Sequence, residues 1–146
     1  MAETLRTRAL RLLARREHSR AELARKLAPH SEDPAQLERV LDELQARGWL
    51  SERRLAEQIV HARRARYGAR RIERELVEKG VAREVLAEAL PELRRGELDA
   101  ARGVWKKKFG RQPRSAAERA RQVRFLQGRG FGLDVILKIV KGGDAD

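Results

Sequence analysis

The pattern Leu-x-x-(Lys/Arg)-Gly-apolar occurs three times in the chain, at residues 44–49, 76–81 and 126–131. Each copy ends a stretch that has the apolar periodicity of a helix. A helix that closes on glycine commonly places it in the left-handed conformation, and the next apolar residue then folds back over the last turn. The pattern therefore predicts an elbow between two helices at each copy, and a chain built from repeated helical units.

The composition favours helices and excludes several protein classes. Aromatic residues make up 4% of the 146 residues and charged residues 38%, with Ala, Leu, Arg and Glu dominant, so we expect an all-α fold without a sheet. The absence of cysteine excludes disulfides and thiolate metal sites. No apolar run is long enough for a membrane span or a signal-peptide core, which predicts a cytoplasmic protein with no membrane contact.

Residues 1–50 are predicted to form the first of three tandem three-helix repeats. Apolar residues spaced for one helix face give a first helix over 4–16. A Ser-x-x-Glu capping box at 19–22 opens the second helix, and the Asp-Pro dipeptide at 33–34 supplies an N-cap and a first-turn proline for the third.

The second repeat is predicted to cover residues 51–91. Ser51 is the expected N-cap of its first helix, which runs to the Tyr-Gly pair at 67–68. The second helix ends at Gly80, and the third ends at Pro91 because proline lacks the N–H that would continue a helix.

The third repeat is predicted to cover residues 92–146. Its first helix is longer and stops at Gly110, a second capping box at 115–118 opens the next helix, and the last helix spans 133–140 before a disordered tail. In such arrays each unit contacts mainly its neighbours, so we expect an elongated, curved array with a concave surface.

Positive charge is concentrated at the end of the chain. The formal net charge is +12, and residues 101–146 contribute +8 of it, since they contain 12 Lys or Arg against 4 Asp or Glu. A surface of this kind attracts polyanions through counterion release, and it would also suit an acidic protein groove. The candidate partner- or DNA-binding residues are Arg70, Arg71, Arg74, Lys106, Lys107, Lys108, Arg111, Arg119, Arg121, Arg124 and Arg129.

Two of these groups have competing interpretations. The arginines between 63 and 74 could bind a partner or form a solvated helix face paired with glutamates. The aromatic and basic run at 105–109 is typical of single-strand-binding surfaces. At helical spacing, however, Trp105 and Phe109 share the apolar face, so we assign both to the core and leave the three lysines between them as the functional part.

No catalytic or metal-binding constellation stands out. His18, His30 and His61 share no ligand spacing, so we propose no metal and no cofactor. The serines are explained as helix caps or loop residues, which leaves no candidate nucleophile. We therefore expect a binding protein rather than an enzyme.

Segments spread over nearly the whole chain carry a family resemblance. They are ALRLLARREHS at 9–19 with the Glu-Leu and Lys-Leu pairs at 22–23 and 26–27, RGWLS at 47–51 with Leu-Ala at 55–56, YGARRI at 67–72 with Glu-Leu at 75–76 and KGV at 79–81, and KKFG at 107–110 with RFL at 124–126 and RGF at 129–131. Together these segments resemble the RecX family of regulatory proteins. Two mild departures are the Ser-Glu pair at 51–52, where the family often has two acidic residues, and Gln122, where an aliphatic residue is common.

The resemblance implies a partner that composition could not identify. RecX proteins bind the RecA nucleoprotein filament, lodge in its groove, and suppress ATP hydrolysis, strand exchange and the coprotease activity that induces the SOS response. The resemblance also implies contact with single- and double-stranded DNA, and we expect a monomer. The alternative is a nonspecific DNA-binding architectural protein whose basic third repeat alone explains its binding.

Overall fold

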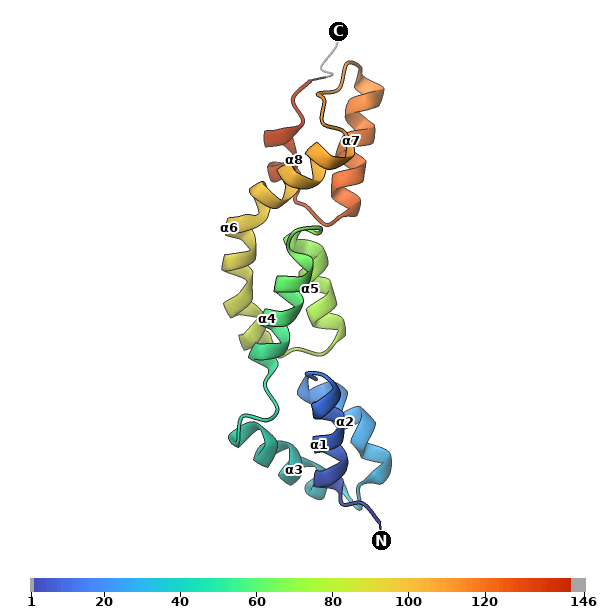
Figure 1. The fold of residues 1–146 in the computed structure, drawn as a ribbon, viewed down its shortest axis with the longest axis vertical. Coiled ribbons are helices and arrows are strands. Elements are labelled where there is room, and N and C mark those ends of the chain that lie inside the picture. The colour runs from blue at the N-terminus through green and yellow to red at the C-terminus, as the bar shows by residue number, and fades with distance from the viewer. Residues whose placement is uncertain (1, 143–146) are drawn as a thin grey trace. The chain divides into compact units, whose positions relative to one another are not determined.

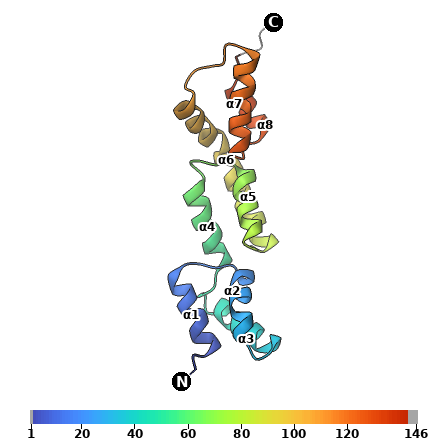
Figure 2. The same cartoon turned by 90° about the vertical axis from the view of Figure 1, so that its right-hand side faces the viewer.

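All regular structure in the described part of the chain, residues 2–142 of the computed structural model, is helical (Figures 1 and 2). The predicted all-α fold is confirmed. The helices are α1 Leu5–Arg15, α2 Arg20–Leu27, the short 3₁₀ helix η1 Ala28–His30, α3 Pro34–Ala46, α4 Glu52–Arg63, α5 Ala69–Glu78, α6 Arg83–Lys108, α7 Ala116–Gly128 and α8 Leu133–Ile139.

The predicted tail falls on residues 143–146, outside the described residues, apart from Gly142. Within residues 2–142, no helix combines the length and apolar character that a membrane span needs.

The described residues group into two compact units, which we treat separately. The N-terminal unit comprises the residues up to Gln58 together with Leu76–Leu86. The C-terminal unit comprises Ile59–Glu75 and the residues from Ala87 onward. The second predicted repeat therefore contributes to both units.

One predicted helix boundary is wrong. We expected a helix to end at Pro91 and a new one to begin after it, but α6 continues through Pro91. Leu93, Glu97, Ala101 and Trp105 are all buried at a spacing of four residues, so the packed face of the helix extends past the proline. This burial outweighs the loss of one backbone hydrogen bond at Pro91.

Local capping signals were largely predicted correctly. Ser19 and Glu22 form a reciprocal capping box at the start of α2, and the Asp33 side chain accepts a hydrogen bond from Gln36 N at the start of α3. The box predicted at the start of α7 is only half formed. The Ser115 hydroxyl accepts from Glu118 N, but the Glu118 carboxylate accepts from Arg114 N instead of from the cap residue.

The three predicted glycine elbows are confirmed. Gly48, Gly80 and Gly130 have φ of 76°, 80° and 89°, within the left-handed region. At each elbow the N–H of the following residue donates to the carbonyl of the leucine that begins the motif, with N···O distances of 2.9, 3.1 and 3.2 Å. The apolar residue after the glycine is buried in the second and third copies. In the first copy Trp49 is instead 39% exposed, and Leu50 is buried in its place.

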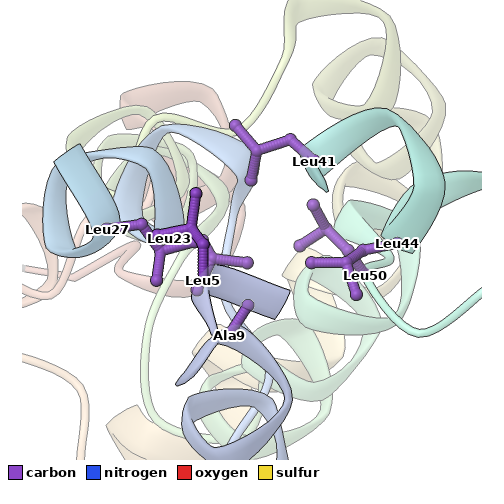
Figure 3. Close-up of a cluster of buried hydrophobic side chains, with 7 residues drawn as sticks. All are labelled: Leu5, Ala9, Leu23, Leu27, Leu41, Leu44 and Leu50. Carbon is purple, nitrogen blue, oxygen red and sulfur yellow. The ribbon is translucent and has the colours of Figure 1, made fainter. Parts of the chain in front are cut away.

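Each unit has its own apolar core. Leucines of α1, α2 and α3 meet in the N-terminal unit, together with Ala9 and Leu50 (Figure 3). In the C-terminal unit the core joins α6, α7 and α8 through residues that include Trp105, Leu126 and Phe131. The assignment of Trp105 to the core is confirmed, and Phe109 is partly buried against the same cluster.

A buried glutamate holds two helix starts together in the N-terminal unit. Glu52, at the first position of α4, is only 8% exposed. One carboxylate oxygen accepts from Arg20 N at the start of α2 (2.8 Å), and the other accepts from Ala82 N just before α6 (2.7 Å). Helix starts have N–H groups without intrahelical partners and a partial positive charge, so a carboxylate satisfies both.

The same arrangement recurs in the C-terminal unit. Glu97 of α6 is also 8% exposed, and its two oxygens accept from Ala69 N at the start of α5 (3.1 Å) and from Gly132 N at the N-cap of α8 (2.9 Å). We refer to these two arrangements, centred on Glu52 and Glu97, as the first and second carboxylate joints. Each connects the second helix of one repeat to the first and third helices of the next.

Backbone carbonyls at the glycine elbows accept further hydrogen bonds beside both joints. In the first, the Ser19 hydroxyl donates to the carbonyl of Lys79, which precedes an elbow glycine. In the second, Gly68 N donates to the carbonyl of Arg129 (2.8 Å), and Arg70 N donates to that of Gly130 (3.2 Å). A side chain at Gly68 would collide with the backbone of Gly130, so this glycine is required by close approach and not by a positive φ.

We predict that Gly80→Ala destabilises the fold more than Gly48→Ala. Both glycines have a left-handed φ, which costs an alanine on the order of 1–2 kcal/mol. A Cβ at Gly80 would in addition lie 2.7 Å from the Cβ of Ala21, whereas a Cβ at Gly48 meets nothing within 4 Å. Urea unfolding of the two variants measures the difference. Equal losses would show that contact with Ala21 does not constrain the elbow.

We predict that Glu97→Gln lowers the free energy of unfolding by about 1–3 kcal/mol, the cost of leaving a buried donor unsatisfied. A glutamine can accept from one of the two N–H groups, but its amide nitrogen then faces the other donor. Glu92→Gln, on the exposed side of the same helix, is the matched control and should change stability by less than about 0.5 kcal/mol. Chemical denaturation of both variants tests this, and similar values for the two would refute the joint.

Candidate nucleic-acid interface

Arginines of the N-terminal unit are largely neutralised by ion pairs. Arg20, for example, lies 2.6 Å from Glu38 and 2.9 Å from Asp42, measured between side-chain nitrogen and oxygen. Further pairs in this unit are Arg6–Glu43, Arg8–Glu3, Arg11–Glu3, Arg16–Glu22, Arg47–Glu43 and Arg54–Glu17. Much of the positive charge of this unit is therefore balanced by neighbouring carboxylates.

Most cations at the end of the chain lack such partners. Among the described residues, none of the three lysines at 106–108 forms an ion pair, nor do Arg111, Arg121 and Arg124. All six are exposed. In the same unit Arg63 is paired with Glu75 at 3.1 Å, and Arg102 with Asp99 at 3.7 Å. The surplus charge seen in the sequence is therefore also free charge on the surface.

The predicted binding residues fall on four segments of the C-terminal unit. Arg70, Arg71 and Arg74 lie on α5, and the lysines 106–108 form the last turn of α6. Arg111 lies in the loop that follows, and Arg119, Arg121 and Arg124 lie on α7, which ends at the C-cap Arg129.

Cations and aromatic rings alternate where α5, α6 and α7 meet. The Arg129 guanidinium lies 5.4 Å from the ring centre of Tyr67 and 5.2 Å from that of Phe125. Arg71 lies 4.1 Å from the Tyr67 ring, and the Lys108 ammonium 5.2 Å from the Phe125 ring. We call these five residues the cation–ring ladder. Ring faces attract cations without neutralising them, so the ladder orders the side chains and leaves their charge available.

The second carboxylate joint places three members of this ladder, Tyr67, Arg71 and Arg129. Tyr67 and Arg71 flank the start of α5, and Arg129 is the C-cap of α7. The backbone bond from Gly68 N to Arg129 O fixes these two segments against each other. Arg129 Nη1 also donates to the carbonyl of Arg66 at 3.3 Å.

Gln122 joins α6 to α7 beneath the predicted lysines. This residue is buried, and its side-chain oxygen accepts from Trp105 Nε1 at 2.8 Å. Its amide nitrogen donates to the carbonyl of Arg111 at 3.0 Å. The polar residue noted as a departure from the family pattern is therefore satisfied on both sides, and it holds the last turns of α6 in place.

Sequence reasoning brought only part of this site together. Lys108, Arg71 and Arg129 were predicted individually, but their common arrangement around Tyr67 and Phe125 was not. The sequence indicates only a helix end at Tyr67 and a family motif around Phe125. Arg70 lines a separate cavity that also contains acidic residues. The sequence signal that could have indicated this arrangement is an aromatic residue directly after a basic one, as Tyr67 follows Arg66 and Phe125 follows Arg124.

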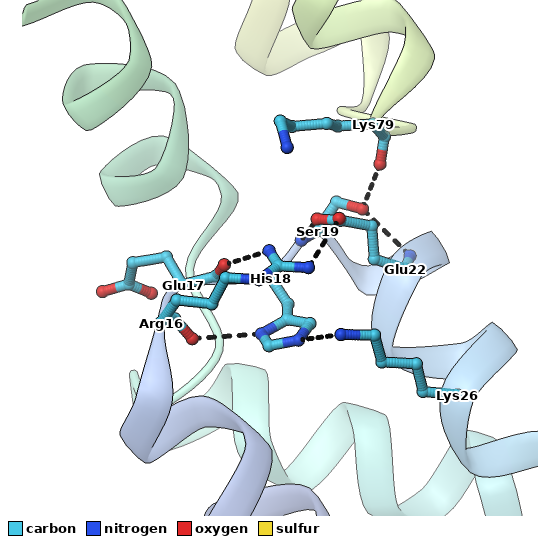
Figure 4. Close-up of polar contacts among 7 residues, drawn as sticks. All are labelled: Arg16, Glu17, His18, Ser19, Glu22, Lys26 and Lys79. Carbon is cyan, nitrogen blue, oxygen red and sulfur yellow. Dashed lines mark hydrogen bonds and ion pairs between the residues drawn. The ribbon is translucent and has the colours of Figure 1, made fainter. Parts of the chain in front are cut away.

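The strongest cluster of buried polar groups outside this site surrounds His18 in the N-terminal unit (Figure 4). His18 is 1% exposed, with Nδ1 3.0 Å from the Arg16 carbonyl and Nε2 3.0 Å from Lys26 Nζ. Because a lysine ammonium only donates, Nε2 accepts and the ring proton lies on Nδ1. Burial lowers the pKa of His18, and the nearby charges of Arg16 and Lys26 lower it further, although its bond to the Arg16 carbonyl opposes this shift.

This cluster has a structural role. Burial alone would raise the pKa of Glu22, but the Ser19 N–H and the Arg16 guanidinium outweigh it, and the pKa lies below its ordinary value. Ser19 is the N-cap of α2, as predicted. Within residues 2–142 no three His, Cys, Asp or Glu side chains are grouped as metal ligands.

We predict that the fold loses stability as the pH falls below about 6.5, the ordinary pKa of histidine. The pKa of His18 is lower in the folded state, so the unfolded chain binds a proton at this residue first as the pH falls. Acidification therefore removes the contribution of neutral His18 to the free energy of unfolding. Thermal unfolding of the wild type and His18→Gln at pH 7.5 and 5.5 measures this, with the exposed His61→Gln as control. An unchanged pH dependence in His18→Gln would contradict the assignment.

The chain is similar to known proteins over nearly its whole length. Three family models match it, described as the first, second and third three-helix domains of RecX, at residues 6–44, 51–90 and 96–140. A protein of Leptothrix cholodnii described as regulatory protein RecX is 52% identical over 97% of this chain and 90% of its own length. A protein of Ralstonia nicotianae with the same description is 47% identical over 97% of this chain and 89% of its own.

Solved structures agree on the fold. The crystal structure of RecX from Lactobacillus salivarius superposes with a TM-score of 0.82 at 17% sequence identity, covering 94% of this chain and 92% of that one. A second crystal structure, described as regulatory protein RecX, gives a TM-score of 0.78 at 18% identity. With three matching domain models and relatives near half identity over almost its whole length, this chain belongs to the RecX family of regulatory proteins.

Proposed function

We propose that this protein is a negative regulator of the RecA recombinase that binds the RecA–DNA filament. It lodges in the filament groove with the cations of its C-terminal unit toward the DNA. From there it suppresses the filament's ATP hydrolysis, strand exchange and coprotease activity. The protein acts by binding and not by catalysis, in keeping with a family of regulatory proteins.

The observation that carries this proposal is the contrast between paired and unpaired cations. Seven arginines of the N-terminal unit are engaged with acidic partners, whereas the lysines at 106–108, Arg121 and Arg124 have none among the described residues. Unpaired cations gain the most from a phosphate backbone, because no internal ion pair has to break first. The DNA-facing side of the protein is therefore its C-terminal unit.

A nonspecific DNA-binding protein is the second candidate, and the same unpaired cations support it. Salt separates the two functions. Binding that depends only on phosphates weakens steeply as the salt concentration rises, whereas a filament-bound protein retains affinity through apolar and shape-matched contacts. Co-sedimentation with filaments of RecA, ATP and single-stranded DNA at increasing salt distinguishes them.

We predict that replacing Lys106, Lys107, Lys108, Arg121 and Arg124 with glutamine weakens DNA association and filament inhibition while the helical core stays intact. All five side chains are exposed, so the helical circular dichroism signal should be unchanged. The slope of log affinity against log salt should flatten by up to about 0.9 for each cation that contacts a phosphate of duplex DNA. Titration against the DNA-dependent ATPase of RecA measures the loss of inhibition.

The matched control replaces Arg63 and Arg64 with glutamine. Arg63 is already paired with Glu75, so this variant should lose less inhibition than the five-site variant. Full inhibition by the five-site variant, together with loss in the control, would place the contact surface on the second repeat instead.

A further inference from the structure

A groove of about 530 Å³ lies beside the cation–ring ladder, between the turn after α4 and the helices α6 and α7. Its cations are Arg66, Lys107, Lys108 and Arg129, and none of its lining residues is acidic. No ion pair within residues 2–142 engages these four cations. The rim of the groove is therefore uniformly positive and unpaired.

The floor of this groove is apolar. Val104 and Phe125 supply its larger apolar side chains. Gly103 also lines the groove and leaves open space there, since a Cβ at this position meets no atom within 4 Å. The Phe125 ring is held at 5.5 Å from Phe109 in an edge-on arrangement. An apolar, partly aromatic floor under a cationic rim matches a planar ring flanked by negative charge.

We propose that this groove takes one unstacked nucleotide of a single-stranded polynucleotide, with the base against Val104 and Phe125 and the flanking phosphates on Lys107, Lys108 and Arg129. This inference rests on the proposed function, because it assumes that the cationic surface faces nucleic acid. Duplex bases are paired and stacked, so only a splayed base can enter. The groove therefore gives the protein a preference for single strands that phosphate contacts alone would not provide.

An acidic peptide fits this groove less well than a nucleotide does, and a neighbouring cavity fits a phosphate less well than this groove does. An acidic peptide would match the rim, but its backbone N–H and C=O groups would lie unsatisfied against the apolar floor. Another cavity of this unit, which contains Arg70 and Arg94, is also lined by Glu73, Glu97 and Asp134. Its mixed charge, and the engagement of Glu97 in the second joint, make it a poor site for phosphate.

Gly103→Leu tests the groove without changing the charge of the protein. The open space at Gly103 accommodates the side chain, and leucine favours a helix interior more than glycine does. We expect the affinity for a fluorescent oligodeoxythymidylate to fall about tenfold, the order expected for the loss of one base held against the apolar floor. Affinity for a duplex of the same length, and the salt dependence of binding, should stay as in the wild type.

Gly128→Leu is the matched control. Gly128 is helical and exposed, a Cβ there also meets no atom within 4 Å, and it does not line the groove. This variant should bind both oligonucleotides as the wild type does. In addition, 2-aminopurine placed in the single strand should brighten on binding to the wild type and to Gly128→Leu, but not on binding to Gly103→Leu.

Three results would overturn the inference. Equal single-strand affinity for Gly103→Leu and the wild type would show that no base enters the groove. An equal loss for single strand and duplex would make the groove an ordinary phosphate contact. If Gly103→Leu lost the binding of an oligoglutamate peptide and kept that of DNA, the groove would be assigned to an acidic peptide. Loss of single-strand binding with full inhibition of RecA would instead support the groove and contradict the proposed function.

Discussion

The arrangement of successive repeats depends on a buried carboxylate shared by two helix starts. Glu52 and Glu97 each accept one backbone N–H from the second helix of a repeat and another from the residue that begins the third helix of the next. A helix start has N–H groups that need an acceptor and a positive end that favours a negative charge, so one carboxylate serves two of them at once. Because the acceptor is buried, water cannot replace it at low cost, and the two helices are tied to one group.

The second joint connects this constraint to the proposed binding surface. It fixes the start of α5 beside the C-cap of α7, and this brings Tyr67 and Arg71 against Arg129. The contacts made by positively charged side chains differ between the two units. In the N-terminal unit, seven arginines form ion pairs with carboxylates, as Arg20 does, including Arg6 and Arg47, which also lie over the Trp49 ring. In the C-terminal unit, cations lie against rings, which order them while leaving their charge for a partner. Net charge alone could not distinguish these two outcomes.

Family membership and the structure address different parts of the function. Membership rests on sequence similarity along the whole chain, and it supports a regulatory role that no single residue reveals. The structure supports where such a protein would contact its partner, since unpaired cations, an ordered ladder and an apolar groove coincide on one unit. The elongated, curved array remains a prediction of the repeat pattern.

The sequence by itself determined the local features of this protein. The glycine elbows and the caps at Ser19 and Asp33 depend on residues within a few positions of one another, so they can be predicted from the sequence. Tertiary structure decided the continuity of α6 through Pro91, where burial of one helix face outweighs a local break signal. It also decided the roles of Glu97 and Arg129, because their partners lie about 30 to 60 residues away, and only folding brings such groups within hydrogen-bond or ring-contact distance.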